Sequence, residues 1–118
     1  MTGRAAEGQQ AEQLAEAHLC SAGLRTQQRN YRCRFGELDL IMRDGDTLVV
    51  AEVRKRSHSA FGGAAASVTS TKQQRIVRAT RQLLAEHPSY QKLAVRFDVI
   101  AIGADNQIDW IQSAFDAH

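Results

Sequence analysis

The chain has 118 residues, of which 43% are hydrophobic and 24% charged, with a formal net charge of +2. This length supports a hydrophobic core but excludes a second domain, so residues 1–118 are expected to form a single domain. No apolar run approaches the roughly eighteen residues that cross a bilayer, and the first residues lack the apolar stretch of a secretory signal. The composition therefore predicts a cytoplasmic protein with no membrane partner.

The first half of the chain predicts one helix and three strands. Residues 7–22 place apolar side chains at helical spacing, and Gly23 supplies the C-terminal stop. A turn at Asp44-Gly45-Asp46 predicts that the second and third strands form a hairpin. The three expected strands cover residues 24–34, 37–42 and 47–53.

The second half predicts one helix and two strands after a loop. Residues 57–68 are small and rich in glycine, which indicates a loop. A second helix is expected to start from a cap at Ser70 or Thr71 and to run to about Glu86. The last two expected strands cover residues 93–102 and 108–111. The order αβββαββ predicts an α/β sandwich in which helices flank a mixed sheet.

The positive charge is concentrated in two blocks. Residues 25–36 hold four arginines and no acid, and residues 53–85 hold seven cations and no acid, which makes +7 for that stretch alone. Twelve of the fifteen cations are arginine, whose planar guanidinium group suits phosphate. This distribution predicts a basic face that binds nucleic acid. The alternative is a solvated surface whose cations are balanced by acids close in space.

Two carboxylates lie in the middle of otherwise apolar strands. If the hairpin loop is Gly45-Asp46, Asp39 falls directly opposite Glu52, with Cβ atoms about 4.5–5.5 Å apart. Arg54 lies two residues beyond Glu52 and is expected to point to the same side of the sheet. A divalent cation such as Mg²⁺, bound by carboxylates and water, would balance the two acids. An ion triad in which Arg54 neutralises both acids would balance them equally well.

Several different short motifs are spread over nearly the whole chain, from about Gly8 to Phe115. They include Gly8-x-x-x-Glu12, Asn30, Gly36-Glu37-Leu38-Asp39-Leu40-Ile41, Phe61-Gly62, Lys72 and Arg96-Phe97-Asp98-Val99. Together they resemble the YraN family of uncharacterised bacterial proteins. That family is similar to nucleases with the PD-D/E-x-K motif and to archaeal Holliday junction resolvases. The resemblance implies a restriction-endonuclease-like three-layer sandwich and a Mg²⁺- or Mn²⁺-dependent endonuclease that acts on DNA, branched DNA included.

The resemblance also implies roles for individual residues. Asp39 takes the place of the first metal-binding aspartate and Glu52 that of the second acidic ligand. Glu12 matches a helix glutamate that approaches the same metal in resolvase-like members. The motif lysine should lie two residues after Glu52, but this chain has Arg54 there, which stays charged and can only hold phosphate or stabilise charge. Lys72, in the first turn of the second helix, is the candidate replacement.

Three hypotheses follow from these residues. The first is an endonuclease with Asp39, Glu52, Arg54 and Lys72 as its catalytic residues, and a resolvase-like reaction would also call for a homodimer because one site cuts one strand. The second is a DNA-binding module that keeps the nuclease fold but cleaves weakly or not at all. The third is a scaffold in which acids and arginines neutralise each other. The expected nucleic-acid contacts are Arg54, Lys55, Arg56, Lys72, Arg75 and Arg78.

Overall fold

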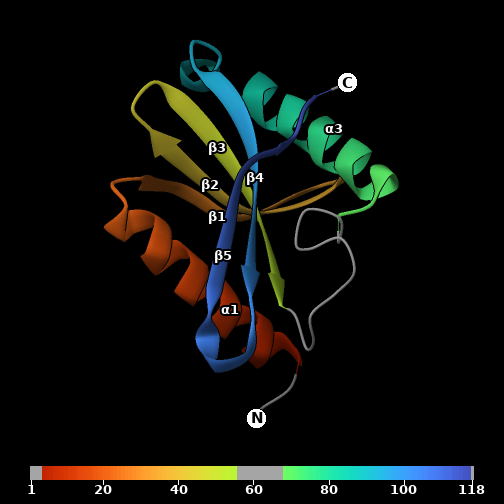
Figure 1. Ribbon diagram of the computed structural model, residues 1–118. Helices are drawn as coiled ribbons and strands as arrows, with labels where there is room; N and C mark the ends of the chain where they lie inside the picture. The colour runs from red at the N-terminus through yellow and green to blue at the C-terminus, as the bar shows by residue number, and fades with distance from the viewer. Residues whose placement is uncertain (1–3, 56–67, 118) are drawn as a thin grey trace.

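The computed structural model describes residues 4–55 and 68–117 (Figure 1). Arg56 and the expected loop over 57–68, apart from Val68, lie outside the described residues. The described elements follow the expected order of helix, three strands, helix and two strands. Their bounds are α1 (Arg4–Ser21), β1 (Arg25–Cys33), β2 (Gly36–Asp44), β3 (Thr47–Lys55), α3 (Ser70–Glu86), β4 (Ala94–Ile102) and β5 (Ile108–Phe115). Short 3-10 turns precede β4 and β5.

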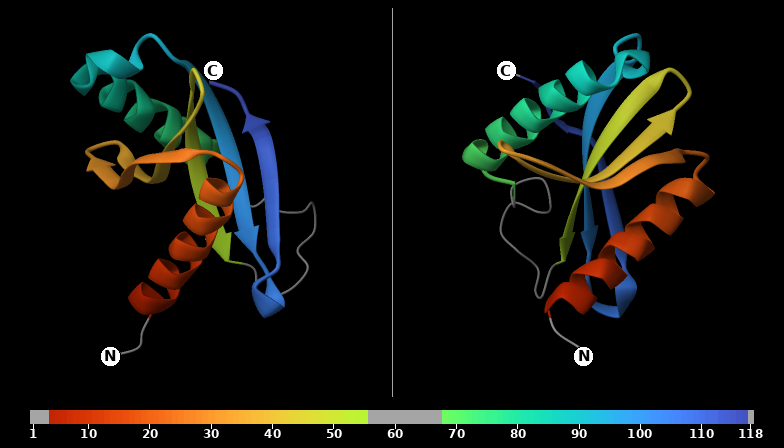
Figure 2. Two further views of the ribbon diagram at one scale, coloured as in Figure 1. Left: turned by 90° about the vertical axis from the view of Figure 1, so that its left-hand side faces the viewer. Right: turned by 180° about the vertical axis from the view of Figure 1, so that it is seen from behind.

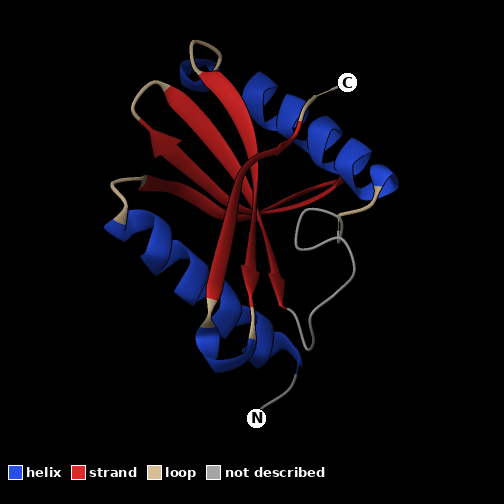
Figure 3. Ribbon diagram, in the orientation of Figure 1, coloured by secondary structure: helices blue, strands red, loops and turns tan. Residues whose placement is uncertain are grey.

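The strands form one mixed sheet with the order β1-β2-β3-β4-β5. Neighbouring strands are antiparallel except β3 and β4, which are parallel and are connected through α3. The two long helices lie on opposite faces of the sheet (Figure 3). The predicted α/β sandwich with a mixed sheet between helices is therefore confirmed. Neither described helix is both long and apolar enough to cross a bilayer.

Each face of the sheet has its own hydrophobic core. On β3, Leu48 and Val50 pack into the core under α3, whereas Val49 and Ala51 pack into the core under α1. Because side chains alternate along a strand, a strand covered on both faces must be apolar at every position. This explains the continuous apolar run of β3, and it makes the buried acid at Glu52 an exception in that run.

The hairpin of β2 and β3 has the register that its turn predicts. Asp44 pairs with Thr47, and the paired residues continue to Leu40 and Ala51. The turn glycine, Gly45, has a φ of 59°, which lies in the left-handed region that favours glycine. Beyond these pairs β1 and β2 diverge from β3 and extend together toward the first turn of α3 (Figures 1 and 2). The separation of β2 from β3 creates the space that holds the candidate site.

Two details differ from the sequence-based expectation. The N-cap of α3 is Thr69, one residue before the expected cap, and its hydroxyl accepts the backbone N–H of Lys72 at 3.2 Å. β5 extends to Phe115 because the strand contains a bulge, at which Ser113 has a φ of 51° and donates its N–H to Oδ1 of the buried Asp98 at 3.0 Å. A contact with a residue fifteen positions away leaves no local trace in the sequence of β5.

Candidate active site

The candidate site is a pocket of about 380 Å³ where β2 and β3 separate under the start of α3. A continued ladder would pair Val53 with Leu38, but the backbone N–H of Val53 donates instead to Oδ2 of Asp39 at 2.9 Å. The Asp39 carboxylate thus takes over a ladder hydrogen bond at the point of divergence. Three elements line the pocket, with the residues Gly36, Glu37, Asp39, Glu52, Thr69, Thr71, Lys72, Arg75 and Ile76.

Lys72 brings an ammonium group to the two strand acids. Its Nζ lies 2.8 Å from Oε1 of Glu52, whose side chain is only 6% exposed. Glu52 also lies within hydrogen-bonding reach of the Asp39 carboxyl group. The structure therefore joins Asp39, Glu52 and Lys72, from β2, β3 and α3, in one pocket. Glu52 thus forms an ion pair with Lys72, twenty residues away in the sequence.

The Asp39 carboxyl group binds a proton more tightly than an ordinary aspartate does. Burial raises the pKa of the Asp39 carboxyl to about 7, and the neighbouring charge of Glu52 adds to the increase. The hydrogen bond from Val53 and the charge of Lys72 lower the pKa of Asp39, but they offset only part of the increase that burial and Glu52 cause. Near neutral pH the Asp39 carboxyl is therefore partly protonated, because burial and the neighbouring charge of Glu52 both disfavour its ionised form.

Glu12 approaches the site from α1 but lines a different pocket, together with Glu16, Arg29 and Asn30. Partial burial raises the pKa of Glu12, and so do the charges of Asp39 and Glu37. With its amide nitrogen turned toward the acids, Asn30 donates to Oε1 of Glu12 at 2.9 Å and to Oε1 of Glu37 at 3.2 Å. Glu12 is thus close enough to interact electrostatically with the candidate site. The Asn30 amide links Glu12 on α1 to Glu37 on β2.

The expected nucleic-acid contacts fall into two groups. Arg75 lines the pocket, and Arg78 follows it by one helical turn, with both residues exposed on α3. Arg54 is half-buried on β3, two residues after Glu52. Lys55 is exposed and lies on the other side of the sheet, as the strand alternation predicts.

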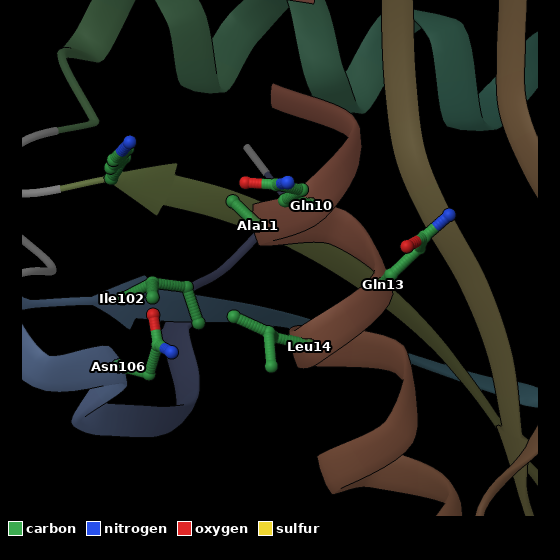
Figure 4. Close-up of a pocket in the computed structure, with 7 residues that line it drawn as sticks. Gln10, Ala11, Gln13, Leu14, Ile102 and Asn106 are labelled. Carbon is green, nitrogen blue, oxygen red and sulfur yellow. The ribbon is translucent and has the colours of Figure 1, made fainter. Parts of the chain in front are cut away.

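A second pocket, of about 430 Å³, lies on the α1 side of the sheet (Figure 4). The amide side chains of Gln10, Gln13 and Asn106 surround it with the apolar Leu14 and Ile102, and Lys55 completes the lining. No carboxylate lies among the described residues of this lining. Its neutral amides supply neither the acid nor the base of a hydrolytic reaction, so the pocket under α3 is the better candidate.

Similarity to known proteins identifies the family of the chain. The model of the Uncharacterised protein family UPF0102 matches residues 11–102. The chain belongs to this family. A UPF0102 protein of Aeromonas hydrophila is 56% identical over 110 residues, which cover 92% of this chain and 84% of that protein. A UPF0102 protein of Nitrosomonas europaea is 50% identical over 112 residues, which cover 93% of each chain. The resemblance to the YraN family is thereby confirmed.

Sequence reasoning did not predict every residue at the candidate site. Thr69 and Thr71 flank Lys72 in the lining of that pocket. Asn30, which the sequence offered only as a motif residue, reaches Glu12 and Glu37 from β1. Asn30 has a φ of 53°, a backbone conformation that asparagine tolerates better than most residues. A hydroxyl or amide side chain in a polar segment carries no signal of its own, so only the folded arrangement identifies these residues.

Proposed function

We propose that this protein is a metal-dependent endonuclease that acts on DNA, including branched DNA. The observation that carries the proposal is the meeting of Asp39, Glu52 and Lys72 in one pocket at the opening between β2 and β3. Two acids and an ammonium group can bind a divalent cation and the phosphate that it contacts. The resemblance to nucleases with the PD-D/E-x-K motif implies Asp39 and Glu52 as the two acids of the motif, and Lys72 is the candidate replacement for the motif lysine.

The donor set fits Mg²⁺ or Mn²⁺. Carboxylate oxygens are the ligands that these hard cations prefer, and Mg²⁺ commonly uses one or two carboxylates while it keeps several waters. Burial first, and then the charge of Glu52, raises the pKa of Asp39, and a cation could take the place of the proton that Asp39 holds. Among the described residues no group of three acidic, histidine or cysteine side chains has the geometry of a metal site. Substrate phosphate and water would therefore complete the ligand set.

Each residue of the candidate site has its own role in the proposed reaction. Asp39 and Glu52 would hold the cation, which would supply a Lewis acid for the scissile phosphate and for water. Lys72 Nζ lies in the pocket next to Glu52, where it can stabilise the negative charge that develops on the phosphate. Glu12 adds negative potential from α1. Arg54 retains its charge at the place of the motif lysine and would hold phosphate rather than accept a proton.

Arg75 and Arg78 provide the main surface for the duplex backbone. Together with Lys72 they follow each other at intervals of three residues on α3, so their side chains lie along one stripe of the helix. None of the described acids pairs with Arg75 or Arg78. Lys55 lies on the far side of the sheet, and Arg56 lies outside the described residues. The DNA-binding surface that we propose is therefore on α3.

A second candidate function is a DNA-binding module with little or no cleavage. The ion pair between Lys72 and Glu52 favours it, because an ammonium group 2.8 Å from a carboxylate oxygen already supplies positive charge to the pocket. Arg54 at the position of the motif lysine favours it as well. Such a module would bind DNA with the steep salt dependence of several phosphate contacts and would leave it intact.

The test is cleavage of a labelled four-way junction and a linear duplex by the purified protein with Mg²⁺ or Mn²⁺. The matched variant is Asp39→Asn, which keeps an oxygen for the Val53 N–H but removes the charge. Cleavage that is lost in the variant while DNA binding remains would support the endonuclease. Salt-sensitive binding without cleavage by either protein would favour the module. Symmetric cuts in the junction, with two protein copies bound in light scattering, would support the homodimer.

A further inference from the structure

The tip of the β1–β2 hairpin lies against the start of α3, next to the candidate site (Figure 2). Gly36, the first residue of β2, lines the pocket, and a Cβ placed on it would lie 3.6 Å from Cβ of Arg75. The hairpin turn consists of Arg34 and Phe35, directly before Gly36. The tip therefore brings an arginine from the first basic block of the sequence to the arginines of the second block.

Arg34 is exposed but held in place. Its guanidinium carbon lies 4.7 Å from the centre of the Phe35 ring, at cation–π distance, and Phe35 in turn packs against the hydrophobic core under α3. No acid in the described part of the chain forms an ion pair with Arg34. An arginine that is already stacked on a fixed ring loses less conformational freedom when it binds a planar or tetrahedral anion.

Three arginines lie near this junction, Arg34 on the hairpin turn and Arg75 and Arg78 on α3. Gly36, two residues after Arg34, approaches Arg75, and none of the three arginines forms an ion pair among the described residues. Like charges that gather on one surface raise its potential and attract an anionic polymer. Arginine is also the side chain that forms two parallel hydrogen bonds to phosphate.

We propose that the β1–β2 hairpin tip is a phosphate-binding element that extends the nucleic-acid surface of α3, with Arg34 as its contact residue. This inference rests on the proposed function in one respect, since it takes the bound polymer to be nucleic acid. The hairpin holds the backbone on the strand side of the pocket while α3 holds it on the helix side. The hairpin thereby orients the phosphate that enters the pocket.

The opposite end of β1 offers a matched control. Arg25 begins the same strand, is equally exposed, and forms no ion pair with any described acid. Nine residue steps separate it from Arg34, a distance of about 30 Å at the usual rise of a strand. Arg25→Ala and Arg34→Ala remove the same charge from the chain. A difference between them therefore reports position and not net charge.

The experiment measures binding of a fluorescein-labelled four-way junction and of a 30-base-pair duplex across a salt series, with EDTA present so that no cleavage occurs. Arg34→Ala is expected to weaken binding about fivefold to tenfold at 0.1 M salt and to reduce the slope of log K against log salt by about 0.9, the value for one phosphate contact. Arg25→Ala is expected to stay within twofold of the unmodified protein, with the same slope. Thermal melts that coincide for all three proteins establish that folding is unchanged.

Three results would overturn the proposal. Equal losses in Arg34→Ala and Arg25→Ala would show that only the total charge matters. No binding of nucleic acid by the unmodified protein would remove both this inference and the proposed function. Polyglutamate that competes as well as nucleic acid at equal charge would identify an acidic protein as the partner. Cleavage with Mg²⁺ is measured separately, so a protein that binds through Arg34 but does not cleave refutes the endonuclease and leaves the hairpin assignment standing.

Discussion

The backbone N–H of Val53 donates to Oδ2 of Asp39 at 2.9 Å, where the hairpin register would have paired Val53 with Leu38. One carboxylate oxygen thus ends the β2–β3 ladder, and the carboxyl group lies beside Glu52. The same side chain satisfies a partly buried backbone donor and supplies a proposed metal ligand. A substitution at Asp39 therefore separates the two roles only if it keeps an oxygen acceptor, as asparagine does.

Asp39→Asn should change how stability depends on pH in metal-free buffer. Folding raises the pKa of Asp39 from 3.8 to about 7, so the folded chain holds a proton that the unfolded chain has released between these values. The stability contributed by this group is complete below pH 3.8 and is lost as the pH rises toward 7. At pH 8 the variant should melt about 3 °C or more above the unmodified protein, and the gap should narrow at pH 5. Melting curves that differ by the same amount at both values would contradict this.

Divalent cations should stabilise the protein more at pH 8 than at pH 6, because the raised pKa of Asp39 keeps a proton on its carboxyl at pH 6, and this proton must leave before Asp39 can bind metal. At Mg²⁺ or Mn²⁺ concentrations of one hundred times Kd, the free energy of unfolding should rise by about 2.7 kcal/mol. Calorimetry in two buffers of different ionisation enthalpy should detect the released proton. Glu52→Gln should abolish the effect, whereas Asp109→Asn, at an exposed acid on β5, should keep it. Equal stabilisation of both variants would place the metal elsewhere.

Lys72→Met should destabilise the fold, since it leaves the buried carboxylate of Glu52 without its ammonium partner. We expect a loss of about 1–3 kcal/mol in urea unfolding at pH 8. Adding Glu52→Gln to Lys72→Met should restore most of that loss, because the double variant has no unpaired charge. Lys72→Arg should retain the ion pair. Strictly additive effects in this double-mutant cycle would show that the pair contributes nothing.

Asp98 should be essential for folding but not for chemistry. Its carboxylate is completely buried and accepts hydrogen bonds from Arg96, Trp110 Nε1 at 2.8 Å and the backbone N–H of Ser113 at 3.0 Å. Asp98→Ala leaves the Arg96 cation and two donors without their partner, and should cost about 3–5 kcal/mol in urea unfolding. Asp109→Ala on the neighbouring strand is the control. A folded Asp98→Ala fraction that has lost metal affinity would contradict a purely structural role.

The two strand acids of the candidate site, Asp39 and Glu52, could be predicted because their placement depends on local rules. The two-residue turn at Gly45-Asp46 sets the hairpin register, and the register brings Asp39 and Glu52 to neighbouring strands. The register pairs stop at Leu40 and Ala51, however, and Asp39 turns to the backbone of Val53 instead of standing opposite Glu52 in a continued ladder. The sequence does not encode that departure locally, since it arises where β2 leaves β3 to follow β1 toward α3.

The sequence by itself determined the order of helices and strands, the faces of β3 and the two strand acids, because periodicity and turn chemistry act over a few residues. Only the tertiary structure decided that Lys72 reaches Glu52, that Asn30 links Glu12 to Glu37, and that the hairpin tip meets α3. These contacts join segments from seven to about forty residues apart. They depend on where the crossover through α3 packs against the sheet, and that position minimises the free energy of the whole chain and not of any one segment.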